Sequence, residues 1–346
     1  MSAMKRNQSV ATIATRPRKA LASFLAASCL AMLLPLASPL ASESKPGKVL
    51  VVMSYDEHND SEIEIAQGIN ETLTGPRLRY VYLDAKNHLE QAAANAKKAY
   101  AVFQEFQPDI VISADDTAQE VFVLPYLQGK TSTPVVFCGV NDSASQYGFP
   151  NAQVTGIVEK KHYRQSIDFA QLIDPGIKKI AVIYRDTPAN EINLDQITRE
   201  EKDYGVTIST IVDVTSSAEL VATLHRLEHT VDALLVLNLA GILGPSGETM
   251  KQNAAMALAA QTWTKASIGA SKNDIEQGIL CGVAKVNLEQ GQVAGRMAKE
   301  ILLGKTPAEI PATENKNGQR IINASTASRL GIKLKPMVLI GTTLVR

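Results

Sequence analysis

The feature that most constrains the fold is an apolar segment that ends in polar residues and leads directly into helix-forming sequence. In the stretch 107–119, QPDIVISADDTAQ, an apolar run at 110–112 precedes Asp115, Asp116 and Thr117. An uninterrupted apolar run predicts a strand buried on both faces, as in a parallel sheet. Asp and Thr before a helix are typical N-cap residues, because their oxygens accept hydrogen bonds from free amides of the first turn. Small ligands bind where such strand ends meet helix starts, so this stretch is a candidate binding segment.

The same unit recurs in two runs of similar size. Strands are predicted at 48–55, 78–83, 110–112 and 134–138, then at 179–184, 207–212, 231–237, 266–270, 279–286 and 320–324. Helices are predicted at 61–73, 89–106, 118–127, 163–173, 190–204, 218–228, 249–260 and 289–303. Parallel strands need crossover connections, and these wind in one hand. The pattern therefore predicts an α/β protein with two doubly wound parallel-sheet domains in tandem.

The N-terminal residues 1–42 are typical of a cleavable secretory signal peptide. Basic residues precede an apolar run at about 20–36, and small residues follow it, so cleavage is expected near 41–42. A retained membrane anchor is the alternative. The run is short of the ~20 apolar residues that a span needs, and Pro35 and Pro39 disfavour a continuous helix. We therefore expect a periplasmic protein whose mature form does not span the membrane.

Charge and cysteine content exclude one class of function and indicate the state of the cysteines. Residues 1–42 hold five of the 35 Lys and Arg residues and no acid, which leaves a net charge of −5 on the remainder. With no basic excess and one Trp, nucleic-acid binding is not expected. Lipidation at Cys29 is an alternative to ordinary signal cleavage. Cys138 and Cys281 end apolar strands, so buried free thiols are favoured over a disulfide between them.

Several catalytic and metal motifs can be weighed and set aside. The sequence has no GxGxxG after its first strand and no GxSxG elbow. The stretch 241–249, GILGPSGET, lacks the lysine of a phosphate loop. His225 and His229 share a helix face, but no further zinc ligand is evident. Asp115 and Asp116 are better interpreted as one cap and one cavity-lining residue than as an acid–base pair. No catalytic residue, metal or cofactor is predicted.

The remaining candidates are polar residues at the predicted strand ends of both runs, where a capping or loop role is the alternative for each. They are Ser54, Tyr55, Asp115, Asp116, Thr117, Asn141, Asp142, Tyr184, Arg185, Asn238, Ser271 and Asn273. Two such sets of strand ends that face each other form a cleft, and clefts between hinged domains close on ligands. We expect Asp115 or Asp116, with Asp142, to accept from a ligand amino group. Arg185 or free helix-start amides are expected to hold a carboxylate.

Several short motifs, in order along the chain, carry a family resemblance. They are Ser54-Tyr55, DAKNH at 84–88, SADD at 113–116, VFCGVND at 136–142, Thr155-Gly156, GQVAG at 291–295 and IIN at 321–323. On these marks, residues 47–346 resemble the type I periplasmic binding proteins of the ABC transporter substrate-binding branch, especially members found beside or fused to sensor kinases. Many relatives carry His-Pro and aromatic residues where this chain has 56–60, and aromatics where it has 271–273. A more polar pocket is therefore expected.

The resemblance implies two lobes joined by a hinge of three crossings. Lobe one would comprise 47–156 plus 280–305, and lobe two 157–279 plus 306–346. The implied function is to close on a small polar ligand, with an amino acid or related zwitterion as the expected class, and to deliver it to an ABC permease. One alternative is a sensing protein that presents its bound state to a membrane sensor kinase or cyclase. A secreted α/β enzyme is the other, and the missing nucleophile–base constellation counts against it.

Overall fold

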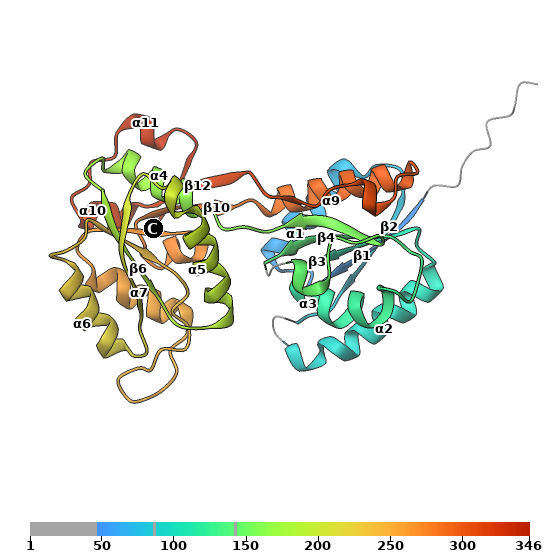
Figure 1. The fold of residues 1–346 in the computed structure, drawn as a ribbon, viewed down its shortest axis with the longest axis horizontal. Coiled ribbons are helices and arrows are strands. Elements are labelled where there is room, and N and C mark those ends of the chain that lie inside the picture. Colours follow the sequence, from blue (N-terminus) through green and yellow to red (C-terminus); the bar gives the residue numbers. More distant parts are fainter. Residues whose placement is uncertain (1–46, 86–87, 142–143) are drawn as a thin grey trace, which may run out of the picture. The chain divides into compact units, whose positions relative to one another are not determined.

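The computed structural model describes residues 47–85, 88–141 and 144–346. The predicted signal peptide lies outside the described residues. The described chain contains two separate sheets, with strand orders β11-β5-β4-β3-β1-β2 and β13-β12-β10-β9-β8-β6-β7 (Figure 1). The prediction of an α/β protein with two doubly wound parallel-sheet lobes is confirmed.

The first sheet is parallel at every pairing. Its strands are β1 (Lys48–Met53), β2 (Arg77–Tyr82), β3 (Ile110–Ala114), β4 (Val135–Val140), β5 (Val154–Val158) and β11 (Thr313–Glu314). Its helices are α1 (Asp60–Thr72), α2 (Ala92–Phe106), α3 (Asp115–Ala118) and α9 (Asn287–Leu302), with a π-helical segment η2 (Gln119–Leu127) and short 3-10 turns η1 (Leu89–Gln91), η3 (Ala144–Tyr147) and η5 (Pro307–Glu309).

Alternate strand residues of this sheet face two different cores. Leu50 and Val52 of β1 pack with Phe122 on the side covered by α2 and η2, whereas Val51 packs with Ile69 on the side of α1 and α9. All of these side chains are fully buried. Burial on both faces explains why β1 and β3 are continuous apolar runs rather than alternating ones.

Helix α9, far from α1 in the sequence, lies beside it against the first sheet (Figure 1). Glycines allow this approach. A Cβ at Gly291 would lie 2.0 Å from the carbonyl oxygen of Ile65, and one at Gly68 would lie 2.3 Å from that of Leu288. Neither position tolerates a side chain without separation of the two helices.

The second sheet is parallel from β7 to β10, and β12 runs antiparallel to β10. Its strands are β6 (Lys179–Tyr184), β7 (Thr207–Asp213), β8 (Ala233–Val236), β9 (Ala266–Gly269), β10 (Cys281–Lys285), β12 (Gly318–Asn323) and β13 (Thr342–Val345). Its helices are α4 (Tyr163–Ile173), α5 (Pro188–Glu200), α6 (Ser217–Leu227), α7 (Gln252–Thr262), α8 (Lys272–Glu276), α10 (Ala324–Arg329) and α11 (Pro336–Leu339), with a 3-10 turn η4 (Glu201–Asp203).

The sheet pairings differ from the expected segment boundaries at two places. Residues 280–305 were expected in lobe one, but β10 pairs with β9 and β12 in the second sheet. Close packing of two glycines accompanies this pairing, since a Cβ at Gly282 would lie 2.2 Å from the carbonyl oxygen of Gly269. Residues 306–346 were expected in lobe two, but β11 pairs with β5 in the first sheet. The chain therefore passes between the sheets after β5, after β10 and after β11.

Cys138 lies in β4 and Cys281 in β10, so the two thiols belong to different sheets. Both are buried and free, which confirms the preferred interpretation. Burial raises the pKa of the Cys281 thiol to about 12, so it stays protonated and acts as a small apolar side chain. Across the described residues, we find no helix that is both long and apolar enough to cross a membrane.

Candidate ligand-binding site

A cavity of about 530 Å³ is lined by residues from the carboxyl ends of strands in both sheets and from α5 and α7. Eight of the residues predicted from the sequence lie in this lining: Tyr55, Asp115, Asp116, Thr117, Asn141, Asn238, Ser271 and Asn273. The carboxyl ends of parallel strands are where open α/β sheets bind ligands. Asp142, also predicted, lies outside the described residues.

Ser54, predicted as a ligand-binding residue, supports the site from beneath. Its side chain is fully buried, and it is absent from the cavity lining among the described residues. The Ser54 Oγ donates to the carbonyl oxygen of Ala114 at 2.7 Å and accepts from the amide of Ala118 at 2.8 Å. It thereby fixes the turn between β3 and α3. Ser54 and Tyr55 follow the last residue of β1, and in this structure Ser54 points into the protein while Tyr55 lines the cavity, so a ligand contact of Ser54 stays a prediction.

Asp115 occupies that turn in a strained backbone conformation. Its φ is +68°, in the left-handed region that costs a non-glycine residue about 1 kcal/mol or more. Its Oδ1 accepts from the amide of Asp116 at 2.7 Å. Burial, and then the neighbouring Asp116 carboxylate, raises the pKa of Asp115 to about 6. Strain of this kind is found preferentially at functional sites, because the surrounding structure must hold it in place.

Asp116 is tied more firmly to its own lobe. Its Oδ2 accepts from the amide of Asn141 at 2.8 Å and from the Asn141 Nδ2 at 3.3 Å. Its Oδ1 accepts from the Tyr147 hydroxyl at 3.0 Å. Asp116 therefore joins the ends of β3 and β4 and holds Asn141 at the cavity. Of the adjacent carboxylates, Asp116 has more of its acceptor capacity committed to this lobe.

Tyr55 lines the cavity, and the buried Glu62 of α1 lies behind it. The Tyr55 amide donates to the Glu62 Oε1 at 2.8 Å. The Oε2 of Glu62 is buried with no hydrogen-bond donor among the described residues. Burial raises the pKa of Glu62 to about 7 and also raises that of the Tyr55 hydroxyl, where Asp115 adds to the shift. The Tyr55 hydroxyl therefore stays protonated at neutral pH, and Glu62 is partly protonated there.

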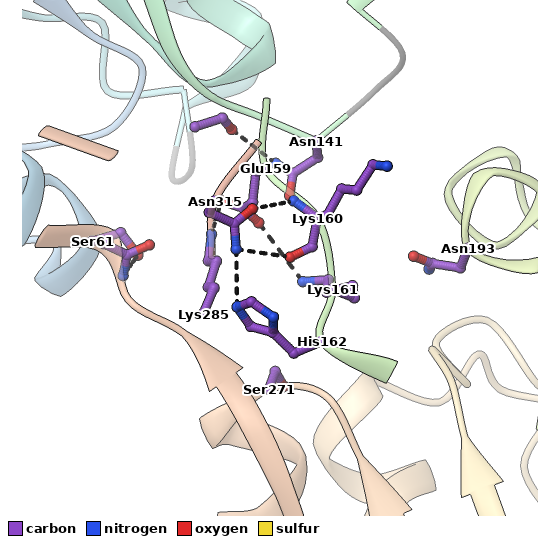
Figure 2. Close-up of polar contacts among 12 residues, drawn as sticks. Ser61, Asn141, Glu159, Lys160, Lys161, His162, Asn193, Ser271, Lys285 and Asn315 are labelled. Carbon is purple, nitrogen blue, oxygen red and sulfur yellow. Dashed lines mark hydrogen bonds and ion pairs between the residues drawn. The ribbon is translucent and has the colours of Figure 1, made fainter. Parts of the chain in front are cut away.

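The three chain crossings meet in a polar cluster beside the cavity (Figure 2). Glu159, which follows β5, has a side chain only 1% exposed and accepts from the Lys285 Nζ at the end of β10. The Lys161 Nζ lies 3.9 Å from the other Glu159 oxygen, Oε1. One buried carboxylate thus binds the first crossing to the second.

Asn315 binds the third crossing to the first (Figure 2). Its Oδ1 accepts from the Lys160 amide at 2.6 Å, and its Nδ2 donates to the Lys160 carbonyl oxygen at 3.2 Å. The same Nδ2 lies 3.0 Å from the Nε2 of His162, a side chain that is itself buried. These contacts make the crossings a connected set rather than three independent linkers.

Polar side chains of the second sheet complete the lining. The Ser271 Oγ accepts from the Asp274 amide at 3.2 Å and caps α8, and the Asn238 Oδ1 accepts from the Ala240 amide at 2.7 Å. The Asn273 Nδ2 donates to Asn253 at 3.0 Å. Burial raises the pKa of the Asp274 carboxyl. Each predicted residue here thus has a local structural role as well as a place at the cavity.

Tyr184 and Arg185 do not lie in the cavity lining among the described residues. The Arg185 guanidinium donates through Nη1 to both carboxylate oxygens of Asp213, at 3.1 and 3.2 Å. Because β6 and β7 are parallel neighbours, the residues at their ends pair with each other instead of with the cavity. In this geometry Arg185 is paired with Asp213 outside the cavity lining, and its contact with a ligand carboxylate stays a prediction.

Sequence reasoning missed the residues contributed by the first crossing and by helix faces. The missed polar or aromatic lining residues are Glu159, Lys161, Tyr163, Asn193, Gln196, Gln252 and Asp274. The EKKHY segment at 159–163 carried a usable signal, since three charged residues directly follow an apolar strand. The residues on α5 and α7 carried none, because an exposed helix face and a cavity-lining face have the same composition. Within the described parts of the chain, His, Cys, Asp and Glu form no group able to hold a metal ion.

The fold and the cavity define a two-lobed ligand-binding protein of the type I periplasmic binding class. The family model described as "ABC transporter substrate binding protein" matches residues 49–345, and the chain belongs to this family. The resemblance to the ABC transporter substrate-binding family that the sequence motifs indicated is confirmed. Members are binding proteins rather than enzymes, and they act outside the cytoplasm. A search of curated proteins found no match.

Solved structures agree on the fold. A ligand-free, open substrate-binding protein with adhesive properties from Clostridium difficile has a TM-score of 0.70 at 16% identity, covering 87% of this chain and 99% of that one. An ABC domain in complex with L-Trp from Streptococcus pneumonia has a TM-score of 0.58 at 20% identity, and the match covers 87% of this chain and 100% of that one. An ABC transporter solute-binding protein from Agrobacterium vitis with bound allitol has a TM-score of 0.51 at 13% identity, and the match covers 82% of this chain and 98% of that one.

Proposed function

We propose that this protein binds a small polar ligand with an ammonium group in the cavity between its two sheets and delivers it to an ABC permease. Amino acids and related zwitterions are the first class to test. We also propose that residues 1–42 are a signal peptide that directs export to the periplasm. The lobes would comprise 47–158 with 287–314, and 163–285 with 318–346, joined by the segments between them.

The observation that carries this proposal is the held carboxylate of Asp115. It lies in the cavity lining, in a left-handed conformation, with one oxygen used by the next amide. A carboxylate accepts hydrogen bonds and donates none, so its natural ligand partner is a donor, and an ammonium group offers three. Tyr55 and Asn141 lie in the same lining and provide further polar contacts.

The energetics required are modest. Micromolar affinity corresponds to about −8 kcal/mol. Hydrogen bonds to a charged group contribute about 1.5–3 kcal/mol each when desolvated, so a few such contacts with burial of apolar surface suffice. The similar Streptococcus structure contains L-Trp, and Tyr55 and Tyr163 line the cavity here. Aromatic amino acids therefore belong in the test panel.

The test is a thermal-shift screen of the purified protein without residues 1–42 against amino acids, amines, sugars and nucleosides, followed by calorimetric titration of each hit. We expect Asp116→Ala and Asn141→Ala to weaken binding about tenfold or more, because each removes a polar contact that orders the cavity. Asp168→Asn, an exposed residue of α4 outside the lining, is the matched control. The site assignment fails if both cavity variants bind as tightly as the wild type.

A further inference from the structure

The charged side chains of the cavity are unbalanced. Four carboxylates line it, from Asp115, Asp116, Glu159 and Asp274. Among the described lining residues, Lys161 is the single Lys or Arg. The carboxylates come from both sheets and from the first crossing, so a ligand anywhere in the cavity has negative charge close to it. Like charges in such a partly desolvated space repel more strongly than in water.

The cations near the cavity already have acidic partners. Arg185 pairs with Asp213, and Lys285 donates to the Oε2 of Glu159. Lys161 lies 3.9 Å from the other oxygen of Glu159. A ligand carboxylate would therefore have to compete with a protein carboxylate for Lys161, and it would do so beside Asp115 and Asp274. The geometry offers a ligand cation several acceptors and a ligand anion little compensation.

Glu159 supplies a second sign that a donor is expected here. Its side chain is 1% exposed, and its Oε1 accepts no hydrogen bond from the described residues. Glu159 also lines an adjoining cavity of about 490 Å³ that shares Asn141 and Gln196 with the first. A buried carboxylate oxygen without a donor is destabilising. An ammonium group brought into the cleft would supply that donor without adding further negative charge.

We propose that the site selects ligands of net positive charge, namely small primary amines or diamines, over zwitterionic amino acids. This inference rests on the proposed function and narrows its ligand class. Loss of the ligand carboxylate should improve binding, and loss of the ammonium should abolish it. The ratio between an amine and its parent amino acid is expected to be about tenfold or more, which corresponds to one charged contact.

The experiment compares matched probes on the wild-type protein by calorimetric titration. L-tryptophan, L-tyrosine and L-lysine are each titrated beside the decarboxylated amine (tryptamine, tyramine and cadaverine) and beside the acid that lacks the α-amino group. The expected order for at least one series is amine, then amino acid, with the Trp- and Tyr-derived acids not binding. Higher salt should weaken amine binding, because screening reduces the attraction of the carboxylates.

Two variants test the residues. Asp115→Asn retains the shape and tolerates a left-handed backbone, and Glu159→Gln retains the length of the side chain. Each should weaken the best amine about tenfold or more and reduce the preference for the amine over its parent. Asp168→Asn removes an equal charge from an exposed position and should change neither quantity. Circular dichroism and thermal melting establish that each variant is folded, and two variants at separate positions keep the test decisive if one does not fold.

The possible results distinguish failure of the amine preference from failure of the proposed ligand-binding function. If the amino acid binds at least as tightly as its amine in every series that binds, the inference is overturned while the proposed function stands. If the ligand is a sugar or nucleoside without an amine, the inference and the ammonium group of the proposed function are both overturned, and only binding of a small polar solute stands. If the variants leave the amine preference unchanged, the inference is likewise overturned. If the wild type binds nothing in the full panel of amines, amino acids, sugars and nucleosides, the proposed function fails and the inference with it.

Discussion

Replacement of Ser54 by alanine should lower both the stability of the protein and its affinity for the ligand. The change removes the hydroxyl that bridges the carbonyl of Ala114, at the end of β3, and the amide of Ala118, in α3. A buried donor left without a partner costs about 1–3 kcal/mol, and the second lost hydrogen bond adds about 1 kcal/mol. We therefore expect the free energy of unfolding to fall by about 2–4 kcal/mol. For a globule of this size, that corresponds to a drop in Tm of about 3–6 °C.

The assay is urea unfolding followed by circular dichroism, with ligand titration on the same samples. Affinity should fall along with stability, because the bridge fixes the turn that holds Asp115 in its left-handed conformation. Ser328→Ala, on an exposed face of α10, is the matched control and should change neither quantity by a measurable amount. Our reasoning about this turn is refuted if Ser54→Ala loses less than about 0.5 kcal/mol, since a bridging hydroxyl cannot be that dispensable.

Three further predictions concern the packing of α1 against α9, the buried Glu62 and the ion pair of Arg185. Gly291→Ala should lower the free energy of unfolding in urea by about 1–3 kcal/mol, because the new methyl would lie 2.0 Å from the Ile65 carbonyl oxygen. An unchanged unfolding midpoint would contradict the close packing of α1 against α9. Glu62 has its pKa raised from 4.5 to about 7, so the folded state binds more protons than the unfolded state across that interval. The free energy of unfolding should therefore decrease as pH rises from about 4.5 to about 7, and Glu62→Gln should make this decrease shallower; parallel profiles for variant and wild type would disprove it. Arg185→Ala should leave ligand affinity within about twofold, because the ion pair with Asp213 lies outside the cavity lining. It should lower the free energy of unfolding by about 1 kcal/mol or less, because the pair is partly exposed. A tenfold loss of affinity would instead indicate that Arg185 contacts the ligand.

The alternation of strands and helices was readable from the sequence because burial on both faces leaves a direct trace in composition. The run at 110–112 became β3, and its polar continuation became the turn that holds Asp115. The crossings were harder to place. Whether β10 pairs with β9 or belongs with α9 depends on contacts between Gly269 and Gly282, and such long-range packing has no local signature.

The candidate site shows the same limit. Polarity at strand ends located eight lining residues, but polarity alone cannot distinguish a side chain that faces the cavity from one that pairs with its neighbour. Ser54 is turned inward to Ala114 and Ala118, and Arg185 pairs with Asp213 because β6 and β7 are neighbouring strands. Glu159 and Lys161 were missed because they lie in the first crossing, whose direction only the folded chain defines. Helix residues such as Gln196 looked like any exposed amide.

The central claim is that this chain holds one small amine-bearing solute in the cavity between its sheets and does not transform it. Calorimetric titration of the wild type with the amine and amino-acid panel, followed by mass spectrometry of the ligand released on denaturation, tests it directly. The account predicts one ligand per chain, affinity on the order of micromolar, and recovery of the ligand unchanged. Absence of binding across the panel, or recovery of an altered product, would contradict it.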